Sequence, residues 1–197
     1  TGDAAISCEQ TVMNLTPENS YREWMRNIVK AQDDNGMIPG IVDLKEKSYD
    51  RSQPPVGSMC VVKLWEKYQD IDFVKEVYPK LFAWNTWFWE NRRTINGDFC
   101  WGSKLPRSGV QFVAANNGIN ELMGAKYETG MDNSPIYDES MYDKETGLML
   151  MADVGLTGLF LKDCSSLMVL AEISGHLEDI TTLRDRRDLA EECLQKL

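Results

Sequence analysis

Apolar side chains recur at every third and fourth position along most of the chain, a spacing that places them on one face of a helix. The first segment with this pattern begins at Thr16-Pro17-Glu18, where a threonine N-cap precedes a proline and an acid in the first helical turn. It ends at Asp33-Asp34-Asn35-Gly36, a cluster of turn-forming residues. The apolar face of this expected helix consists of Tyr21, Trp24, Met25, Ile28 and Val29.

Later segments repeat this helical pattern, and loops of very unequal length separate them. We expect further helices over residues 59–70, 73–93, 111–126, 156–173 and 177–197. The long loops between them cover residues 36–55, 102–109 and 127–155. Long connections inside a compact domain are uncommon and usually functional. We therefore expect an all-α array of helical hairpins with binding loops gathered at one end, and the lack of a strict sequence period disfavours a solenoid of uniform repeats.

The composition is that of a folded protein, with 43% hydrophobic and 26% charged residues. A length of 197 residues suits one domain or part of a larger one. The net charge of −10 argues against nucleic acid or an anionic membrane as the main partner, because both require a concentrated basic face. We also expect no membrane span, since charged residues interrupt the most apolar run, Leu148 to Ile173, at Asp153, Lys162, Asp163 and Glu172.

The chain starts at Thr1 without a methionine and stops at Leu197 inside a charged helical pattern. We therefore expect residues 1–197 to be one partial domain cut from a longer protein at both ends, and we assign no compartment. The five cysteines are widely spaced, odd in number and lack a C-x-x-C pair, so we expect buried free thiols rather than disulfides or a zinc site.

The sharpest chemical motif is Glu128-Thr129-Gly130-Met131-Asp132-Asn133-Ser134-Pro135. Gly130 frees the backbone and Pro135 stiffens the exit, so a rigid loop presents Asp132. Glu128 lies four residues earlier, and a second carboxylate nearby would help hold Asp132 protonated, as an acid catalyst requires. The alternative is an ordinary turn whose Asp and Asn bond only to their own backbone.

Two further loops carry candidate binding residues. Arg51-Ser52-Gln53-Pro54-Pro55 offers several hydrogen-bond donors ahead of a rigid Pro-Pro entry, and it suits either sugar hydroxyls or a helix start with a solvated arginine. Pro106-Arg107 follows Trp101-Gly102, and an arginine beside an exposed tryptophan can line a polar cleft with one stacking surface. We expect Trp84 and Trp87 in the core and leave Trp89 and Trp101 open.

Other chemistries are excluded by what the chain lacks. His176 is the single histidine, which excludes His-based triads and multi-histidine metal sites within the chain. The glycine of Asp33-Asp34-Asn35-Gly36 arrives too early for a calcium loop, and the chain has no Gly-rich phosphate loop. We therefore expect no metal and no cofactor.

Taken in order, these motifs resemble the clan of inverting glycosidases that contains the trehalases and the family 63 glucosidases. Arg51-Ser52-Gln53-Pro54-Pro55 resembles the trehalase Arg-Ser-Gln-Pro-Pro loop, and Pro106-Arg107 is similar to the Pro-Arg ahead of the acid motif. Glu128-Thr129-Gly130-Met131-Asp132 resembles the Glu-Ser-Gly-x-Asp element that carries the general acid. Asn133-Ser134-Pro135 looks more like family 63, including its mannosyl-oligosaccharide glucosidases, than like trehalase. With the Gly36-Met37-Ile38-Pro39 turn, the resemblance covers residues 3 to 175.

This resemblance implies an (α/α)₆ toroid with the active site at the loop end, of which residues 1–197 form only part. It implies inverting hydrolysis of an α-glycosidic, in particular α-glucosidic, bond in a disaccharide or oligosaccharide. Asp132 would be the general acid, with the base, normally a glutamate, on the missing part of the ring, so the chain alone is expected to be inactive. The expected substrate-binding residues are Arg51, Gln53, Trp101, Arg107, Glu128 and Asn133.

Three rival functions stay open at this point. A trehalase-type activity fits the same motifs. A non-catalytic helical module that binds carbohydrate or another protein fits a partial ring, and its partner would be the rest of the toroid. A lyase on a similar toroid is disfavoured, because uronate binding needs several cationic residues and the candidate binding motifs contain only two arginines, Arg51 and Arg107.

Overall fold

The computed structural model describes residues 2–14, 18–42, 48–105 and 119–196. Seven α-helices, one 3₁₀ turn and one two-stranded antiparallel sheet make up the regular structure of these residues. The elements are α1 (Gly2–Asn14), α2 (Glu18–Lys30), α3 (Gly57–Tyr68), α4 (Ile71–Asn91), α5 (Leu122–Glu128), the 3₁₀ turn η1 (Pro135–Tyr137), β1 (Tyr142–Asp143), β2 (Leu148–Met149), α6 (Val154–Ser174) and α7 (Asp179–Lys196).

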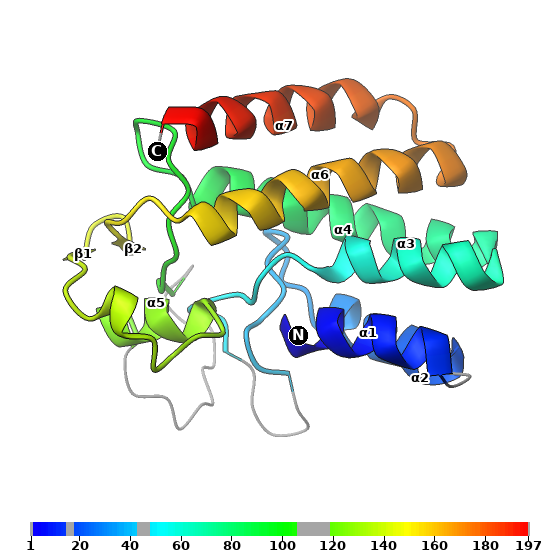
Figure 1. Cartoon of the computed structure of the whole chain (residues 1–197), viewed down its shortest axis with the longest axis horizontal. Coiled ribbons are helices and arrows are strands. Elements are labelled where there is room, and N and C mark those ends of the chain that lie inside the picture. The colour runs from blue at the N-terminus through cyan, green and yellow to red at the C-terminus, as the bar shows by residue number, and fades with distance from the viewer. Residues whose placement is uncertain (1, 15–17, 43–47, 106–118, 197) are drawn as a thin grey trace.

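The long helices lie side by side, and the short elements gather at one end of them (Figure 1). α6 packs against α7, α4 and α3, while α1 packs on α3 and α2 on α4. α5 and the β1–β2 hairpin lie together at the end of the helices from which α6 starts (Figure 1). This arrangement confirms the expected all-α architecture with its loops gathered at one end.

Capping residues explain where the longest helices begin and end. Asp70 caps α4 by accepting a hydrogen bond from Phe73 N at 3.0 Å, and Asp153 caps α6 by accepting one from Leu156 N at 2.6 Å. α6 stops at Gly175, which has φ +90 and takes the left-handed conformation that only glycine adopts without strain. These local signals fix both ends of α6, the helix against which α3, α4 and α7 pack.

α6 is long and apolar enough to cross a membrane, the one helix of this kind in the described part of the chain. Half of its apolar stretch is nevertheless buried, with Phe160, Leu167 and Leu170 fully enclosed. These three residues therefore belong to the helical core. Trp84 and Trp87 are also buried, which confirms the core position expected for them.

A buried polar cluster lies within this helical core and joins four helices. Asp163 on α6 accepts hydrogen bonds from Ser58 Oγ on α3 and from Asn85 Nδ2 on α4, the latter at 2.7 Å. Arg186 on α7 reaches the other end of the Asn85 amide, with Nη1 2.9 Å from Oδ1. Burial raises the pKa of Asp163 from its ordinary value of 3.8 to about 7, against the lowering effect of its hydrogen bonds.

Two expectations about secondary structure were wrong in their extent. Within the helix expected over 111–126, residues 119–121 are not helical and α5 begins at Leu122. Asn120 has φ +56, and its side chain accepts a hydrogen bond from Leu105 N at 3.0 Å. Residues 111–118 lie outside the described part. The loop expected over 127–155 contains the β1–β2 hairpin and η1. No helix was expected over α1, whose sequence shows no strong amphipathic pattern.

Candidate active site

A cavity of about 430 Å³ opens where the motif loops meet. Its described lining residues are Asp3, Gly40, Ile41, Arg51, Gln53, Tyr127, Gly130 and Asp132. They come from α1, from the turn after α2, from the loop before α3 and from the end of α5. The fold thus brings together two sequence motifs, around Arg51 and Asp132, that stand about eighty residues apart.

The loop that carries Arg51 and Gln53 is held by the Met37-Ile38-Pro39-Gly40 turn. Ser52 Oγ donates to Ile38 O at 2.7 Å and accepts a hydrogen bond from Trp84 Nε1 at 2.8 Å. Gly40 N donates to Arg51 O at 2.9 Å. A Cβ atom at Gly40 would lie 2.9 Å from Ser52 O, so only glycine permits this close approach.

Arg51 lines the cavity, although its side chain is only 3% exposed. Its Nε is 3.2 Å from Asp50 Oδ2, its Nη1 donates to Gly124 O at 3.2 Å, and its charged group lies 5.0 Å from the centre of the Tyr127 ring. Within the described part of the chain, Arg51 Nη2 has no hydrogen-bond partner. Burial raises the pKa of Asp50 above its ordinary value, although the hydrogen bond from Ser103 and the charge of Arg51 act in the opposite direction.

Asp132 lies just beyond α5 on a tight turn. Gly130 has φ +72, and Thr129 Oγ1 caps the turn by donating to Lys126 O at 2.7 Å and accepting from Met131 N at 2.8 Å. Ser134 N then donates to Met131 O at 2.9 Å. The side chain that satisfies this turn is therefore Thr129, and Asp132 projects to the cavity instead, unlike the ordinary-turn alternative.

Glu128 has a different role from the one expected. It is 0% exposed, and each carboxylate oxygen accepts two hydrogen bonds: Oε1 from Ser52 N at 2.6 Å and Arg92 Nη2 at 2.8 Å, Oε2 from Arg92 Nε at 2.6 Å and Gly102 N at 2.8 Å. A fully enclosed carboxylate cannot touch substrate, and the Arg92 guanidinium compensates its charge. Glu128 instead ties together the segments around Ser52, Gly102 and Asp132.

Three other expected residues are placed as follows. Trp101 is 2% exposed, so it is a core residue and not the exposed stacking surface that we expected. Its carbonyl oxygen accepts a hydrogen bond from Met149 N at 2.8 Å, which fixes it against β2. Asn133 is exposed next to Asp132 and is not among the described residues of the cavity wall. Arg107 lies outside the described residues.

Sequence reasoning missed Asp3, Tyr127 and Arg92. No motif marked Asp3, because the segment before residue 16 gave no amphipathic signal. Tyr127 directly precedes the acid motif, and no pattern in the sequence distinguishes it. Arg92 lies at the end of α4, where it also packs 4.4 Å from the centre of the Trp87 ring. Only the tertiary contact with Glu128 reveals its importance.

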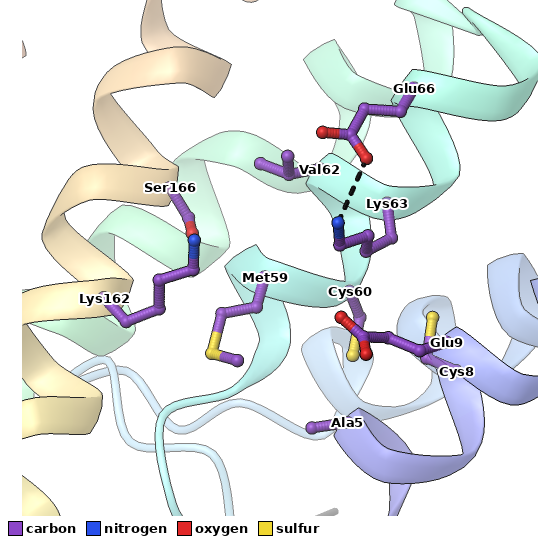
Figure 2. A pocket seen from close by; sticks show the side chains of 10 residues that line it. All are labelled: Ala5, Cys8, Glu9, Met59, Cys60, Val62, Lys63, Glu66, Lys162 and Ser166. Carbon is purple, nitrogen blue, oxygen red and sulfur yellow. Dashed lines mark hydrogen bonds and ion pairs between the residues drawn. The ribbon is translucent and has the colours of Figure 1, made fainter.

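A second, smaller cavity of about 150 Å³ lies between α1, α3 and α6 (Figure 2). Cys8 and Cys60 face it from α1 and α3, and a hydrogen bond from Cys60 lowers the pKa of Cys8. Lys63 and Glu66 form an ion pair of 3.3 Å at its rim (Figure 2). All five cysteines are free, four of them buried as expected. No group of three or more potential metal-binding side chains occurs in the described part of the chain.

The helical array and the comparison with known proteins together define the class of this protein. The helices, with the short elements gathered at one end, have the arrangement expected of part of an (α/α)₆ toroid. The family model of the mannosylglycerate hydrolase MGH1-like glycoside hydrolase domain matches residues 18–197, and the chain belongs to this family. The family 63 resemblance seen in the motifs is thereby confirmed.

Individual relatives agree with this assignment. The chain is 27% identical over 153 residues to mannosylglycerate hydrolase MGH2 of Selaginella moellendorffii, covering 66% of this chain and 27% of the relative. It is 26% identical to MGH1 of the same organism, with the same coverage. The chain thus spans about a quarter of the length of these curated relatives.

Solved structures show the same fold. A conserved protein of Thermus thermophilus superposes with a TM-score of 0.68 at 20% identity, covering 98% of this chain and 54% of that one. A GH63 mannosylglycerate hydrolase from the same organism, in complex with glucose, gives a TM-score of 0.67 at 18% identity, covering 98% of this chain and 55% of that one. The chain therefore has the fold of about half of these structures.

Proposed function

We propose that this chain supplies the general-acid half of an inverting α-glycosidase, with Asp132 as the acid. The observation that carries the proposal is that Asp132 lines one cavity together with Arg51 and Gln53. Its volume of about 430 Å³ lies in the usual range for small-ligand sites, about 300–1,000 Å³. A short sugar chain therefore fits a wall that carries both a proton donor and hydroxyl-binding groups.

In the proposed reaction, Asp132 donates its proton to the glycosidic oxygen as the bond to the anomeric carbon breaks. A carboxylate base outside this chain takes a proton from a water on the opposite face of the sugar, and that water attacks with inversion. Acid and base in such pairs are separated by about 6.5–9.5 Å, which leaves room for the water. Arg51 and Gln53 donate hydrogen bonds to hydroxyl oxygens of the sugar, and the unpaired Arg51 Nη2 supports this role.

The first substrate to test is mannosylglycerate, because the named relatives hydrolyse it according to their names. α-Glucosides come second, since glucose is bound in one structural neighbour. Trehalase-type activity is the third member of the panel. All three substrates present a neutral sugar ring to the cavity, and the proposed reaction uses no metal or cofactor.

The test uses the longest natural chain that contains this sequence, with hydrolysis and product anomer followed by NMR. Asp132→Asn should lower the rate on a natural glycoside by at least about 10²-fold, the usual contribution of a general acid. Its rate on the corresponding glycosyl fluoride should fall much less, because fluoride leaves without a full proton transfer. Asp34→Asn, at an exposed aspartate away from the cavity, is the matched control.

Two results would contradict the proposal. Equal losses on the glycoside and the fluoride would mean that Asp132 is not the acid. Retention of the anomeric configuration would exclude the inverting pair. The 197-residue chain alone should bind sugar without turnover; if the longest chain also binds sugar but hydrolyses none of the panel, the carbohydrate-binding module becomes the better description.

A further inference from the structure

The first turn of α1 reaches the proposed catalytic cavity. Asp3 lines the 430 Å³ cavity with Arg51, Gln53 and Asp132. It also lines an adjoining cavity of about 300 Å³, which shares Gln53 and Gly130 with the first. Asp3 is exposed, so its carboxylate is accessible to a ligand in either space.

The wall of the cavity must offer hydrogen-bond acceptors to the hydroxyl groups of a sugar. Each hydroxyl of a sugar both accepts and donates hydrogen bonds, so a sugar site needs acceptors as well as donors. Arg51 supplies donors only, and the Gln53 amide supplies one donor group and one acceptor oxygen. Of the two carboxyl groups among the described wall residues, Asp132 donates a proton in the proposed reaction, which leaves Asp3 as the carboxyl group that can accept hydrogen bonds from the sugar.

We infer that Asp3 binds the sugar in this cavity by accepting hydrogen bonds from its hydroxyl groups. The inference rests on the proposed function for the assignment of Asp132. Hydrogen bonds to an ionised acceptor are about twice as strong as neutral ones, so a single carboxylate can dominate the affinity for a neutral sugar. Asp3 lines the same cavity as Arg51, which forms an ion pair with Asp50.

The packing of α1 holds Asp3 at this place. Cys8 lies one to two turns further along α1 and is 1% exposed, facing Cys60 on α3 (Figure 2). Ser7 Oγ donates to the carbonyl oxygen of Asp3 at 2.8 Å, which closes the first turn. The carboxylate is therefore presented by a helix that packs on α3.

The experiment measures sugar binding directly, so that it does not depend on turnover. Methyl α-D-mannopyranoside and methyl α-D-glucopyranoside are titrated by calorimetry into the longest natural chain carrying Asp132→Asn. Adding Asp3→Asn or Asp3→Ala should raise the Kd of the better ligand at least tenfold, while Asp34→Asn leaves it within twofold. Circular dichroism melts check that α1 remains folded in each variant.

Deoxy sugars separate a direct contact from a structural effect. For the deoxy analogue that lacks the hydroxyl bound by Asp3, the Asp3→Asn change should alter Kd by less than twofold. An equal loss on every deoxy analogue, an unchanged Kd for the parent glycosides, or no binding by the parent protein would each overturn the inference. Weakened binding without any Asp132-dependent hydrolysis would refute the proposed function and leave Asp3 as a sugar ligand.

Discussion

Replacing Glu128 by glutamine tests whether this buried carboxylate holds the active-site loops together. Its two oxygens accept four hydrogen bonds between 2.6 and 2.8 Å, two of them from Arg92. Glutamine keeps one acceptor oxygen and turns the other into an NH₂ donor. In either orientation two of the four donors then face an amide hydrogen, and the Arg92 guanidinium, 3% exposed, loses its counter-charge.

The expected loss of stability is large. Breaking a buried ion pair by removing one partner costs about 3–5 kcal/mol, because the remaining charge stays desolvated. The whole free energy of unfolding of a typical domain is about 5–15 kcal/mol. For a chain of this size, a loss of this magnitude corresponds to a fall in Tm of about 6–20 °C.

Urea unfolding followed by circular dichroism at pH 7 measures this loss. Glu139→Gln makes the same chemical change at an exposed position and should shift the free energy of unfolding by less than about 0.5 kcal/mol. A double-mutant cycle with Arg92→Met should show that Glu128 and Arg92 are coupled, since each variant leaves the other group unpaired. If Glu128→Gln loses less than about 1 kcal/mol, the network does not hold the loops as we argue.

Two further predictions concern the core and the binding loop. The pKa of Asp163 is raised from 3.8 to about 7 in the fold. The carboxyl group of Asp163 therefore makes its full contribution to the stability of the fold below pH 4, and this contribution is lost as the pH rises through about 7. Asp163→Asn should therefore gain stability over the parent as the pH rises, by at most about 4 kcal/mol above pH 7; equal pH profiles in urea unfolding would refute this. Gly40→Ala places a Cβ 2.9 Å from Ser52 O and should cost about 1–3 kcal/mol and weaken sugar binding, whereas Gly158→Ala, with open space around it, should be neutral or stabilising. Similar melts and similar Kd values for both alanine variants would contradict the close packing at Gly40.

Local signals in the sequence were sufficient for most helices. The expected segments 59–70, 73–93, 156–173 and 177–197 differ from α3, α4, α6 and α7 by a few residues at their ends. Turn-forming residues and caps such as Asp70 and Gly175 act on their immediate neighbours, so they can be recognised without tertiary information. Where a residue left the helical region for a distant partner, as Asn120 does toward Leu105, the expectation failed.

The site shows the same division. The motif around Asp132 and the loop with Arg51 and Gln53 could be identified by sequence resemblance, and the fold brings them to one cavity. The roles of Glu128 and Trp101 could not be derived, because burial depends on what packs around a side chain. Arg107 stays a prediction, since it lies outside the described residues.

By itself, the sequence determined the helical class, the position of the main helices and the motifs that carry the proposed chemistry, since each depends on residues close together in the chain. Only the tertiary structure decided which carboxylates are available to a ligand. Glu128 is enclosed by Arg92 and two backbone amides, whereas Asp3, from a segment without any motif, lies in the wall beside Asp132. Desolvation and ion pairing depend on neighbours distant in sequence, and these set the role of each charged group.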